Sequence, residues 1–370
     1  MILKKIVSRL FKETLRVNLE ILVSMTQKLG KASMLWDILS QVYQQKSNNL
    51  CQYRLTPKYS EAFSKSEVRT NTDGKELAIV IQGPIDNEFD FTIETVKIYK
   101  KLFPNSYIII SSWKDMPSEK ENELKSLGCY VLLSDYPKPM GYFHLNYQVL
   151  STMVGLKKAK ELGAKYCIKN RSDLRINKYQ SFEYLKSLLE VFPLKGNEIP
   201  LKGRIISLSG WRGQMFYPFW IQDYMYFGYT DDLINLFEIP MDDRDIPNSS
   251  CFTNGENRIK TGKEFTQTLS PEMYITYHFT KKYIHIDDLS VRQSWDIVQK
   301  YFIIMNFEDL NIIWKKHGRF SLNEILMESD GKTMYTDPYR IFTFSDFVNL
   351  YTGQMDYRIE YENMREKLPF

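Results

Sequence analysis

Residues 144–176 read "HLNYQVLSTMVGLKKAKELGAKYCIKNRSDLRI" and hold a helical pattern followed by a short apolar strand. The apolar positions of the helix recur three or four residues apart, at Leu145, Val149, Met153 and Leu156. The pattern predicts a helix over 144–162 that stops at Gly163, then a strand over 165–170. The charged segment "RSDLR" (171–175) follows this strand directly. Such a change from apolar to charged residues at a strand end is typical of a sheet edge that binds a ligand.

The same alternation precedes this stretch. Apolar runs predict strands at 77–83, 107–113 and 129–134, and helical patterns occupy 88–102 and 117–127. Strands that alternate with helices favour βαβ units, and therefore a parallel sheet with right-handed crossovers. After residue 173 the pattern weakens, with strands expected at 204–208 and 224–228 and a short helix at 231–238.

Composition narrows the class of protein. The chain has 370 residues, 43% of them hydrophobic, which is enough for one large or two moderate domains with a sizeable core. A net charge of +4 argues against a dedicated nucleic-acid binder. The four cysteines form no CxxC pair, so neither a zinc site nor a disulfide framework is expected. Cys129 and Cys167 lie in apolar runs and are predicted to be buried thiols of a cytoplasmic protein.

The N-terminal segment differs from the rest. Residues 1–50 predict a helical extension, with an apolar face and a basic face that carries Lys5, Arg9, Lys12 and Arg16. Such a helix either lies on an anionic membrane surface, at the inner face of the cytoplasmic membrane, or packs on its own domain. No stretch approaches the roughly 20 apolar residues of a spanning helix. We expect a linker at 51–75, a main domain at 76–290 and a C-terminal α+β region of unknown role at 291–370.

Polar residues follow the predicted strands, where a parallel sheet binds its ligands. After the first strand come Gln82, Gly83 and Pro84, and Ser112 stands near the end of the second. The helix at 144–162 begins with three further polar residues: His144, Asn146 and Gln148. Amides both donate and accept hydrogen bonds, which suits a base or a ribose. The alternative for the first group is an ordinary strand-ending turn, and for the residues at the helix start it is helix capping.

Arg171, Asp173 and Arg175 form the sharpest cluster. Alternation places all three on one side if the chain stays extended. The arginines would then bind phosphate, and the carboxylate would hold a divalent metal. A structural ion-pair ladder is the alternative. Arg212, between two glycines, is a further candidate for a phosphate or a ring.

Two acids are candidates for general-base catalysis. Asp223 lies within an aromatic stretch, where burial raises the pKa of a carboxyl group. Glu272 follows Ser270 and Pro271, so a helix start explains it as well. The chain has no G-x-G-x-x-G after the first strand and no G-x-x-x-x-G-K-[ST]. It therefore does not fit a dinucleotide-dependent dehydrogenase or a P-loop enzyme.

Four segments in this order, "IVIQGP" (79–84), "FPNSYIIISSW" (103–113), residues 144–176 and "QDYMYFG" (222–228), resemble the WavE family of lipopolysaccharide-synthesis proteins. The resemblance covers roughly residues 76–290. It implies a GT-A-like (Rossmann-like) fold, a mostly parallel sheet flanked by helices. In that fold an acidic motif after the fourth strand holds a metal and the sugar-nucleotide diphosphate, and Asp173 stands in the matching place.

One feature departs from the GT-A pattern. Asp173-Leu174-Arg175 replaces the usual Asp-x-Asp, so one acid has become a base. Both Mn²⁺ or Mg²⁺ dependence and metal independence therefore stay open.

The resemblance implies a glycosyltransferase, such as a hexosyltransferase, that uses a nucleotide-sugar donor and a lipopolysaccharide, capsular or lipid-linked glycan acceptor. The donor would contact Gln82, Gly83, Asn146 and Gln148, among others, with Asp223 or Glu272 as base. Two alternatives are a non-catalytic glycan- or nucleotide-binding scaffold and a nucleotidyl- or phosphotransferase.

Overall fold

The computed structural model describes residues 75–87, 90–210, 214–246, 261–286, 289–315, 341–355, 357 and 359–367, with scattered positions between residues 14 and 25. The chain divides into two compact units, Met1–Pro57 and Lys58–Phe370. In the first unit the described positions are helical, and Asn18 donates from Nδ2 to the carbonyl oxygen of Thr14. The apolar side chains of this helix are exposed, at Val17, Ile21, Leu22 and Met25.

The second unit contains the strands and helices that the sequence predicts, with further elements at its C-terminal end. The strands are β1 (Leu77–Gln82), β2 (Ser106–Trp113), β3 (Tyr130–Ser134), β4 (Tyr166–Arg171), β5 (Leu174–Arg175), β6 (Ile205–Leu208), β7 (Met225–Tyr229), β8 (Phe302–Met305) and β9 (Ile313–Trp314). The helices are α3 (Phe91–Leu102), α4 (Ser118–Ser126), α5 (Leu145–Glu161), α6 (Ser181–Val191), α7 (Thr230–Phe237), α9 (Gly262–Thr268), α10 (Pro271–Lys281), α11 (Val291–Tyr301), α13 (Phe344–Thr352) and α14 (Glu360–Lys367). Short 3-10 turns are η3 (Tyr142–His144), η4 (Gln214–Phe216) and η5 (Phe307–Leu310).

Within the described residues, seven strands form one sheet in the order β3-β2-β1-β4-β7-β6-β8. Neighbouring strands run parallel except at β7, which is antiparallel to both β4 and β6. A second, two-stranded sheet pairs β5 with β9. The predicted fold class, a mostly parallel α/β sheet flanked by helices, is confirmed.

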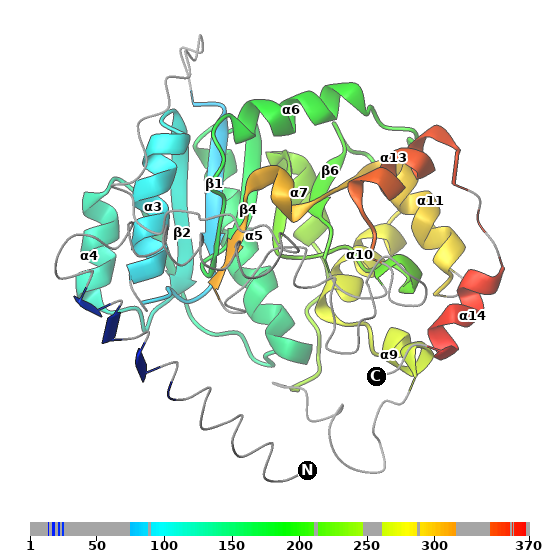
Figure 1. Cartoon of the computed structure of the whole chain (residues 1–370), viewed down its shortest axis with the longest axis horizontal. Coiled ribbons are helices and arrows are strands. Elements are labelled where there is room, and N and C mark those ends of the chain that lie inside the picture. The colour runs from blue at the N-terminus through cyan, green and yellow to red at the C-terminus, as the bar shows by residue number, and fades with distance from the viewer. Residues whose placement is uncertain are drawn as a thin grey trace. The chain divides into compact units, whose positions relative to one another are not determined.

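Helices cover both faces of this sheet (Figure 1). On one face α5 approaches β1 so closely that a Cβ on Gly155 would lie 2.3 Å from Val80 Cγ1. Side chains alternate along a strand, so Ile81 and its register partner Asn170 point to the other face. There Asn170 donates from Nδ2 to the Tyr99 hydroxyl of α3, at 2.9 Å. The main sheet is therefore a buried middle layer.

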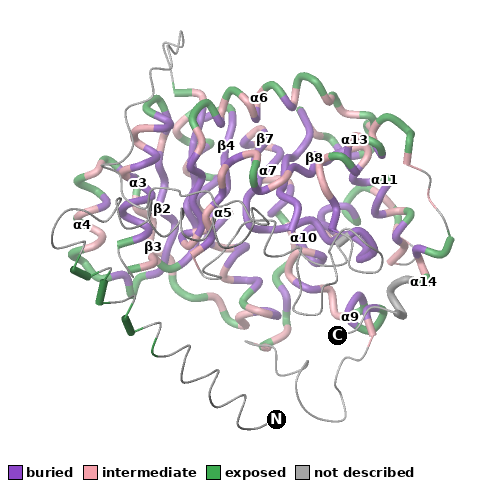
Figure 2. The backbone as a smooth tube through the Cα atoms, viewed as in Figure 1, coloured by how far each residue is buried: buried purple, intermediate pink, exposed green. Residues whose placement is uncertain are grey.

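The burial pattern explains the continuous apolar runs in the sequence. Strand β1 is buried along its whole length, whereas the edge strand β3 is half-exposed, as Figure 2 shows. Strands covered on both faces need apolar side chains at every position rather than at alternate ones. Cys129 and Cys167 are buried free thiols, as predicted.

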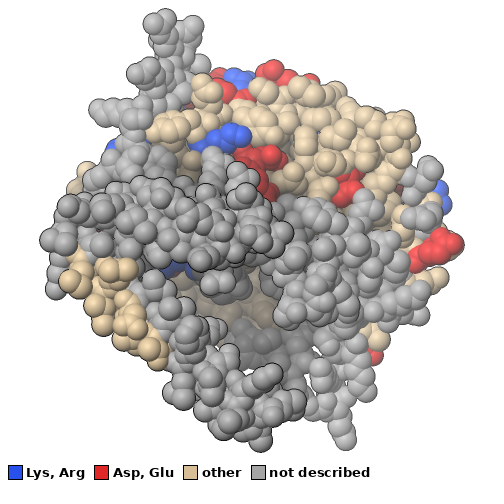
Figure 3. All heavy atoms as spheres, viewed as in Figure 1, with Lys and Arg blue, Asp and Glu red and all other residues tan. Residues whose placement is uncertain are grey.

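The sheet extends beyond residue 290. Strand β8 pairs in parallel with β6, and β9 pairs with β5 next to the end of β4. Segments of the predicted C-terminal region thus belong to the same compact unit as β1. Lysine and arginine side chains lie beside aspartate and glutamate side chains on the face drawn in Figure 3. No helix among the described residues is long and apolar enough to span a membrane.

Candidate active site

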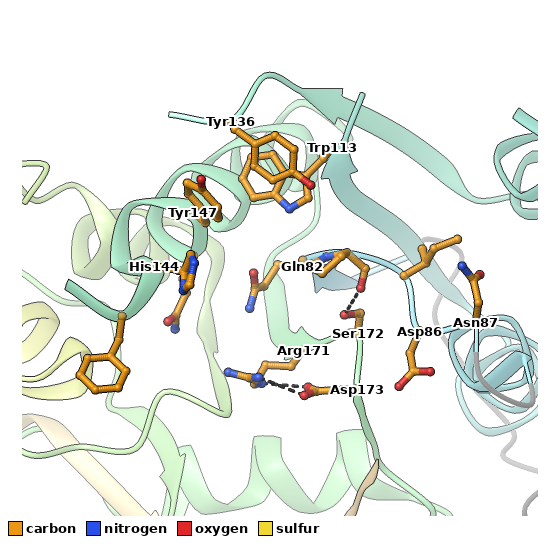
Figure 4. A pocket seen from close by; sticks show the side chains of 15 residues that line it. Gln82, Asp86, Asn87, Trp113, Tyr136, His144, Tyr147, Arg171, Ser172 and Asp173 are labelled. Atoms are coloured by element: carbon orange, nitrogen blue, oxygen red, sulfur yellow. Dashed lines mark hydrogen bonds and ion pairs between the residues drawn. The ribbon is translucent and has the colours of Figure 1, made fainter. Parts of the chain in front are cut away.

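A cavity of about 630 Å³ opens at the carboxyl ends of β1, β2 and β4 (Figure 4). Seven of the residues that the sequence singles out line it: Gln82, Gly83, Pro84, His144, Gln148, Arg171 and Asp173. The parallel arrangement explains this convergence, because neighbouring parallel strands end at the same edge of a sheet. The loop after β3 and the start of α5 complete the cavity wall.

One wall of the cavity is aromatic. The rings of Trp113 and Tyr136 stack with their centroids 4.6 Å apart, and Tyr147 lies 5.3 Å from Trp113 and 5.1 Å from Tyr136. Trp113 is buried, while Tyr136 is 40% exposed. The Tyr136 hydroxyl donates to Asp115 Oδ2 at 2.8 Å, which fixes the ring. We call Trp113, Tyr136 and Tyr147 the aromatic wall; Tyr136, its exposed member, offers a stacking surface.

Two glutamine amides, those of Gln82 and Gln148, also line the cavity. Gln82 accepts through Oε1 from the Ser151 hydroxyl of α5 at 2.9 Å, so its Nε2 is the group left to donate. The Nε2 of Gln148 is buried without a hydrogen-bond partner in the described part of the protein. A buried donor that lacks a partner costs free energy unless a ligand or water supplies an acceptor. The amides therefore favour a ligand rich in acceptors.

The charged end consists of Arg171 and Asp173, opposite the aromatic wall in Figure 4. Arg171 donates to Asp173 from Nε at 2.9 Å and from Nη2 at 3.0 Å. Burial lowers the pKa of Arg171, but the hydrogen bonds to Asp173 together with the charges of Asp173 and Asp223 outweigh burial and raise the pKa above its ordinary value. Trp314 adds a third hydrogen bond, from Nε1 to Asp173 Oδ2 at 3.0 Å. A charged guanidinium is thus fixed beside the cavity.

This arrangement does not fit a metal site at Asp173. Both carboxylate oxygens already accept hydrogen bonds from Arg171 or Trp314. In the part of the chain that the structure describes, no three His, Cys, Asp or Glu side chains gather as a metal-binding group. The sequence agrees with this, because Arg175 stands where the usual Asp-x-Asp motif has its second acid.

The structure adds residues that sequence reasoning missed. Asp86 and Asn87, just beyond β1, line the cavity, as do Tyr136 and Tyr147. Ser172 ties β4 to the loop after β1, donating from Oγ to the carbonyl of Pro84 at 2.5 Å. The position of Asp86 three residues after the predicted strand was a usable signal. Nothing in the sequence links it to its ion-pair partner Lys315.

Backbone strain marks the rim formed by the loop before α5. Phe143 and His144 both lie in the left-handed region, with φ of 51° and 62°, and both line the cavity. Two such residues in a row cost of order 1–3 kcal/mol each and need support from their surroundings. Asn146 supplies support, because its Nδ2 donates to the carbonyls of Pro139 at 2.9 Å and of Asp242 at 2.7 Å. Asn146 therefore anchors the rim and does not line the cavity.

Two further candidate residues, Ser112 and Arg175, do not line the cavity. Ser112 is buried on β2 and lies outside the cavity, because alternation turns the next residue, Trp113, toward it. Arg175 does not join Arg171, since the chain turns at Ser172 and Asp173 instead of staying extended.

Arg175 points to α3, where it donates to the hydroxyl of Thr95 at 2.8 Å and to the carbonyl of Phe91 at 3.0 Å. Burial lowers its pKa to about 10. Arg212 lies outside the described residues.

Asp223 and Glu272 lie near the cavity but do not line it. Asp223 is buried, and its backbone carbonyl accepts a hydrogen bond from the buried Lys169 ammonium. Burial lowers the pKa of Lys169 to about 7, against the attraction of Asp223. Burial and the Asp223 charge raise the pKa of Glu272 to about 7, although Ser270 donates to its Oε2 at 3.0 Å. A compact group of ionisable residues therefore lies beside Arg171.

The main sheet defines an α/β protein with a mostly parallel sheet, and the cavity lies at the carboxyl ends of its strands. A family model described as "WavE lipopolysaccharide synthesis" matches residues 77–352. The chain belongs to this family. No curated protein matches the sequence.

Several solved structures are similar to part of this chain. They include a mannose-1-phosphate geranyltransferase from Thermus thermophilus, 13% identical, covering 44% of this chain and 60% of that one, TM-score 0.28. A glycosyltransferase involved in the glycosylation of the major capsid of PBCV-1 is 12% identical over 44% of this chain and 63% of its own, TM-score 0.22. The chain thus spans less than two thirds of the length of these two proteins. Core-mannan synthase A from Aspergillus fumigatus, in a Mn/GDP form, is 9% identical over 71% of this chain and 81% of its own, TM-score 0.31.

The raised pKa of Glu272 predicts a specific pH dependence of stability. Its pKa of about 7 exceeds the ordinary value of 4.5. At pH values between these two, unfolding releases a proton from Glu272, so the stability of the fold falls as pH rises. Between pH 5 and pH 8 we expect the unfolding free energy of the wild type to fall by about 2 kcal/mol more than that of Glu272→Gln. Urea unfolding at both pH values measures this. Glu190→Gln, at an exposed site, is the control, and equal pH slopes for the wild type and Glu272→Gln would contradict the assignment.

Proposed function

We propose that this chain is a glycosyltransferase that moves a sugar, such as a hexose, from a nucleotide-activated donor to a lipopolysaccharide or capsular polysaccharide acceptor. The observation that carries the proposal is a cavity with an aromatic wall at one end and the Arg171 guanidinium at the other. A sugar nucleotide has the matching order of groups, a flat base followed by ribose and phosphate. The family's place in lipopolysaccharide synthesis supports the acceptor class.

The base of the donor is assigned to the aromatic wall. Stacking of a nucleobase on an aromatic side chain contributes about 1–3 kcal/mol, and Tyr136 is exposed enough to offer its face. The unpartnered Nε2 of Gln148 would donate to a base carbonyl or a ribose oxygen. Gly83 has φ of 106°, which only glycine adopts without strain, and lets the β1 loop approach the ligand closely.

The phosphates are assigned to Arg171. A guanidinium binds phosphate oxygens through several N–H groups, and Asp173 occupies only Nε and Nη2. In the reaction the acceptor hydroxyl oxygen attacks the anomeric carbon as the bond from that carbon to the phosphate oxygen breaks. The nucleotide leaves with the electron pair, and a fixed positive charge at Arg171 stabilises it. This proposal needs no metal at Asp173.

The proton of the acceptor hydroxyl needs a base. Asp223 is our first candidate and Glu272 the second. The Asp223 charge raises the pKa of Arg171 and the Arg171 charge lowers that of Glu272, which places both acids within electrostatic reach of the guanidinium. Neither lines the cavity, so the acceptor would have to reach the buried side of Arg171.

A binding scaffold without turnover is the second candidate function. The aromatic wall favours it, because stacking alone holds sugars and bases.

Product analysis separates these functions. We expect sugar transfer with release of a nucleoside diphosphate, or of a monophosphate from a CMP-sugar, from a panel of nucleotide sugars. Asp173→Asn should loosen Arg171, and Asp223→Asn should remove the base; loss of a general base lowers kcat by roughly 10²-fold or more. Near-wild-type rates for both variants would contradict the roles assigned to Asp173 and Asp223. Pyrophosphate release would instead indicate a nucleotidyltransferase, and binding without turnover a scaffold.

The aromatic wall gives a separate prediction for binding. Tyr136→Ala should weaken nucleotide affinity roughly tenfold, because it removes the exposed stacking surface. Calorimetric titration with UDP, GDP, CDP, ADP, TDP and CMP measures the affinity. Tyr179→Ala is the matched control, since Tyr179 is 38% exposed, like Tyr136 at 40%, and lies outside the cavity. Equal losses in the two variants would show that the wall does not hold the base.

The N-terminal helix is proposed as a peripheral contact with an anionic membrane at the inner face of the cytoplasmic membrane. Exposed apolar side chains at Val17, Ile21 and Met25 support this, because they form a surface that inserts among lipid headgroups. Full-length protein should sediment with vesicles that contain anionic lipid, and a chain that begins at residue 51 should stay in the supernatant. Sedimentation of the shortened chain to the same extent would rule this role out.

A further inference from the structure

The C-terminal strand β9 and the residue after it contact both acidic side chains that line the cavity. Trp314 donates from Nε1 to Asp173 Oδ2 at 3.0 Å, and the next residue, Lys315, forms an ion pair with Asp86. The first contact joins residues that are 141 positions apart in the chain, and the second joins residues that are 229 positions apart. Since Asp86 follows β1 and Asp173 follows β4, one short segment holds the acids of two neighbouring loops.

The backbone of β9 fixes the position of these two side chains. Trp314 pairs with Leu174 and Ile313 with Arg175 in the antiparallel β5–β9 ladder. The amide of Lys315 also donates to the carbonyl oxygen of Asp173 at 2.9 Å. Asp173 is therefore held by its main chain and by its carboxylate, through neighbouring residues of the same segment.

The indole of Trp314 touches both members of the charged pair. Its Nε1–H binds the Asp173 carboxylate, and the Arg171 guanidinium carbon lies 5.5 Å from the ring centroid. The indole also packs on the Tyr224 ring at 4.4 Å, and only 5% of the residue is exposed. A rigid, packed ring thus contacts an arginine whose side chain otherwise has many rotamers.

We infer that Trp314 is a positioning residue for the donor nucleotide, which it serves by holding Asp173 and Arg171 in one orientation before the ligand binds. The inference rests on the proposed function, in which Arg171 binds the phosphates. An arginine that is already fixed loses little conformational entropy when it binds, so its contacts contribute more to affinity. Without the indole N–H, Asp173 Oδ2 loses a neutral donor and the pair is free to reorient toward solvent.

The chain offers a matched control for a merely structural role of the indole. Trp295 is also buried, at 4% exposure, and its Nε1 donates at 3.0 Å to the carbonyl oxygen of Met215, outside the cavity. Replacement of either tryptophan by phenylalanine removes one N–H donor and keeps an aromatic ring. Each variant loses one indole hydrogen bond, and only the bond of Trp314 has an acceptor that lines the cavity.

The test compares wild type, Trp314→Phe and Trp295→Phe in calorimetric titrations with the six nucleotides UDP, GDP, CDP, ADP, TDP and CMP, after circular dichroism confirms folding. We expect Trp314→Phe to weaken the affinity of the binding nucleotide roughly tenfold, the usual worth of a hydrogen bond to a charged group. Trp295→Phe should change it less than about twofold. In the transfer assay, Trp314→Phe should raise KM for the donor more than it lowers kcat.

Lys315→Met keeps the inference testable if Trp314→Phe does not fold. It removes the ion pair with Asp86 from the same segment, and we expect a roughly threefold loss of nucleotide affinity. Lys186→Met is its control, because Lys186 pairs with Glu76 outside the cavity. Equal affinities for these two variants would overturn the inference.

The failures of the two ideas are distinguishable. Wild-type binding with no difference between Trp314→Phe and Trp295→Phe overturns this inference and leaves the proposed function intact. Equal losses in both variants overturn it as well, since they indicate a general structural effect. A wild-type protein that binds none of the six nucleotides overturns the proposed function and this inference with it.

Discussion

The pair of hydrogen bonds between Arg171 and Asp173 sets the chemistry of the cavity. It forms where the chain leaves β4 and turns, so the charges lie at the edge where β1 and β2 also end. Because Asp173 neutralises part of the guanidinium charge, an arginine is tolerated at a half-buried position. Its remaining donor capacity is available to an anion. A carboxylate occupied in this way suits the positioning of an arginine better than the binding of a divalent cation.

Much of the fold could be predicted from local patterns. Strands buried on both faces leave continuous apolar runs, and helices between them leave a period of 3.6 residues, so β1 to β4 and α5 lie close to their expected bounds. The stops at Gly128 and Gly163 were reliable signals because both glycines have positive φ, at 75° and 76°. Parallel strands end at one edge of the sheet, which is why Gln82, Gln148 and Asp173 line the same cavity.

The remaining features depend on contacts that no local pattern encodes. Simple alternation predicts Arg175 beside Arg171, but a two-residue turn at Ser172 and Asp173 breaks the alternation and sends Arg175 to α3. The aromatic wall combines the end of β2, the loop after β3 and the first turn of α5. The pairing of β9 with β5 joins distant parts of the chain through two residues. Trp314 thus reaches the Arg171–Asp173 pair from a region whose sequence carries no recognisable chemistry.

Burial links the site to the energetics of the fold. Lys169, Asp223 and Glu272 form a group beside Arg171 in which the cost of lost hydration outweighs the attraction of opposite charges, so burial lowers the pKa of Lys169 and raises that of Glu272. Such a group is costly to maintain without partners, and the pKa values of Lys169 and Glu272 both lie at about 7. That property suits a site that moves a proton.

A crystal structure of the protein with a bound nucleotide would show whether the cavity holds the donor. We expect the base against Trp113, Tyr136 and Tyr147, with the phosphate oxygens within hydrogen-bond distance of Arg171 and no metal ion on Asp173. An ordered nucleotide elsewhere on the protein, or one in the cavity whose phosphates point away from Arg171, would contradict this expectation.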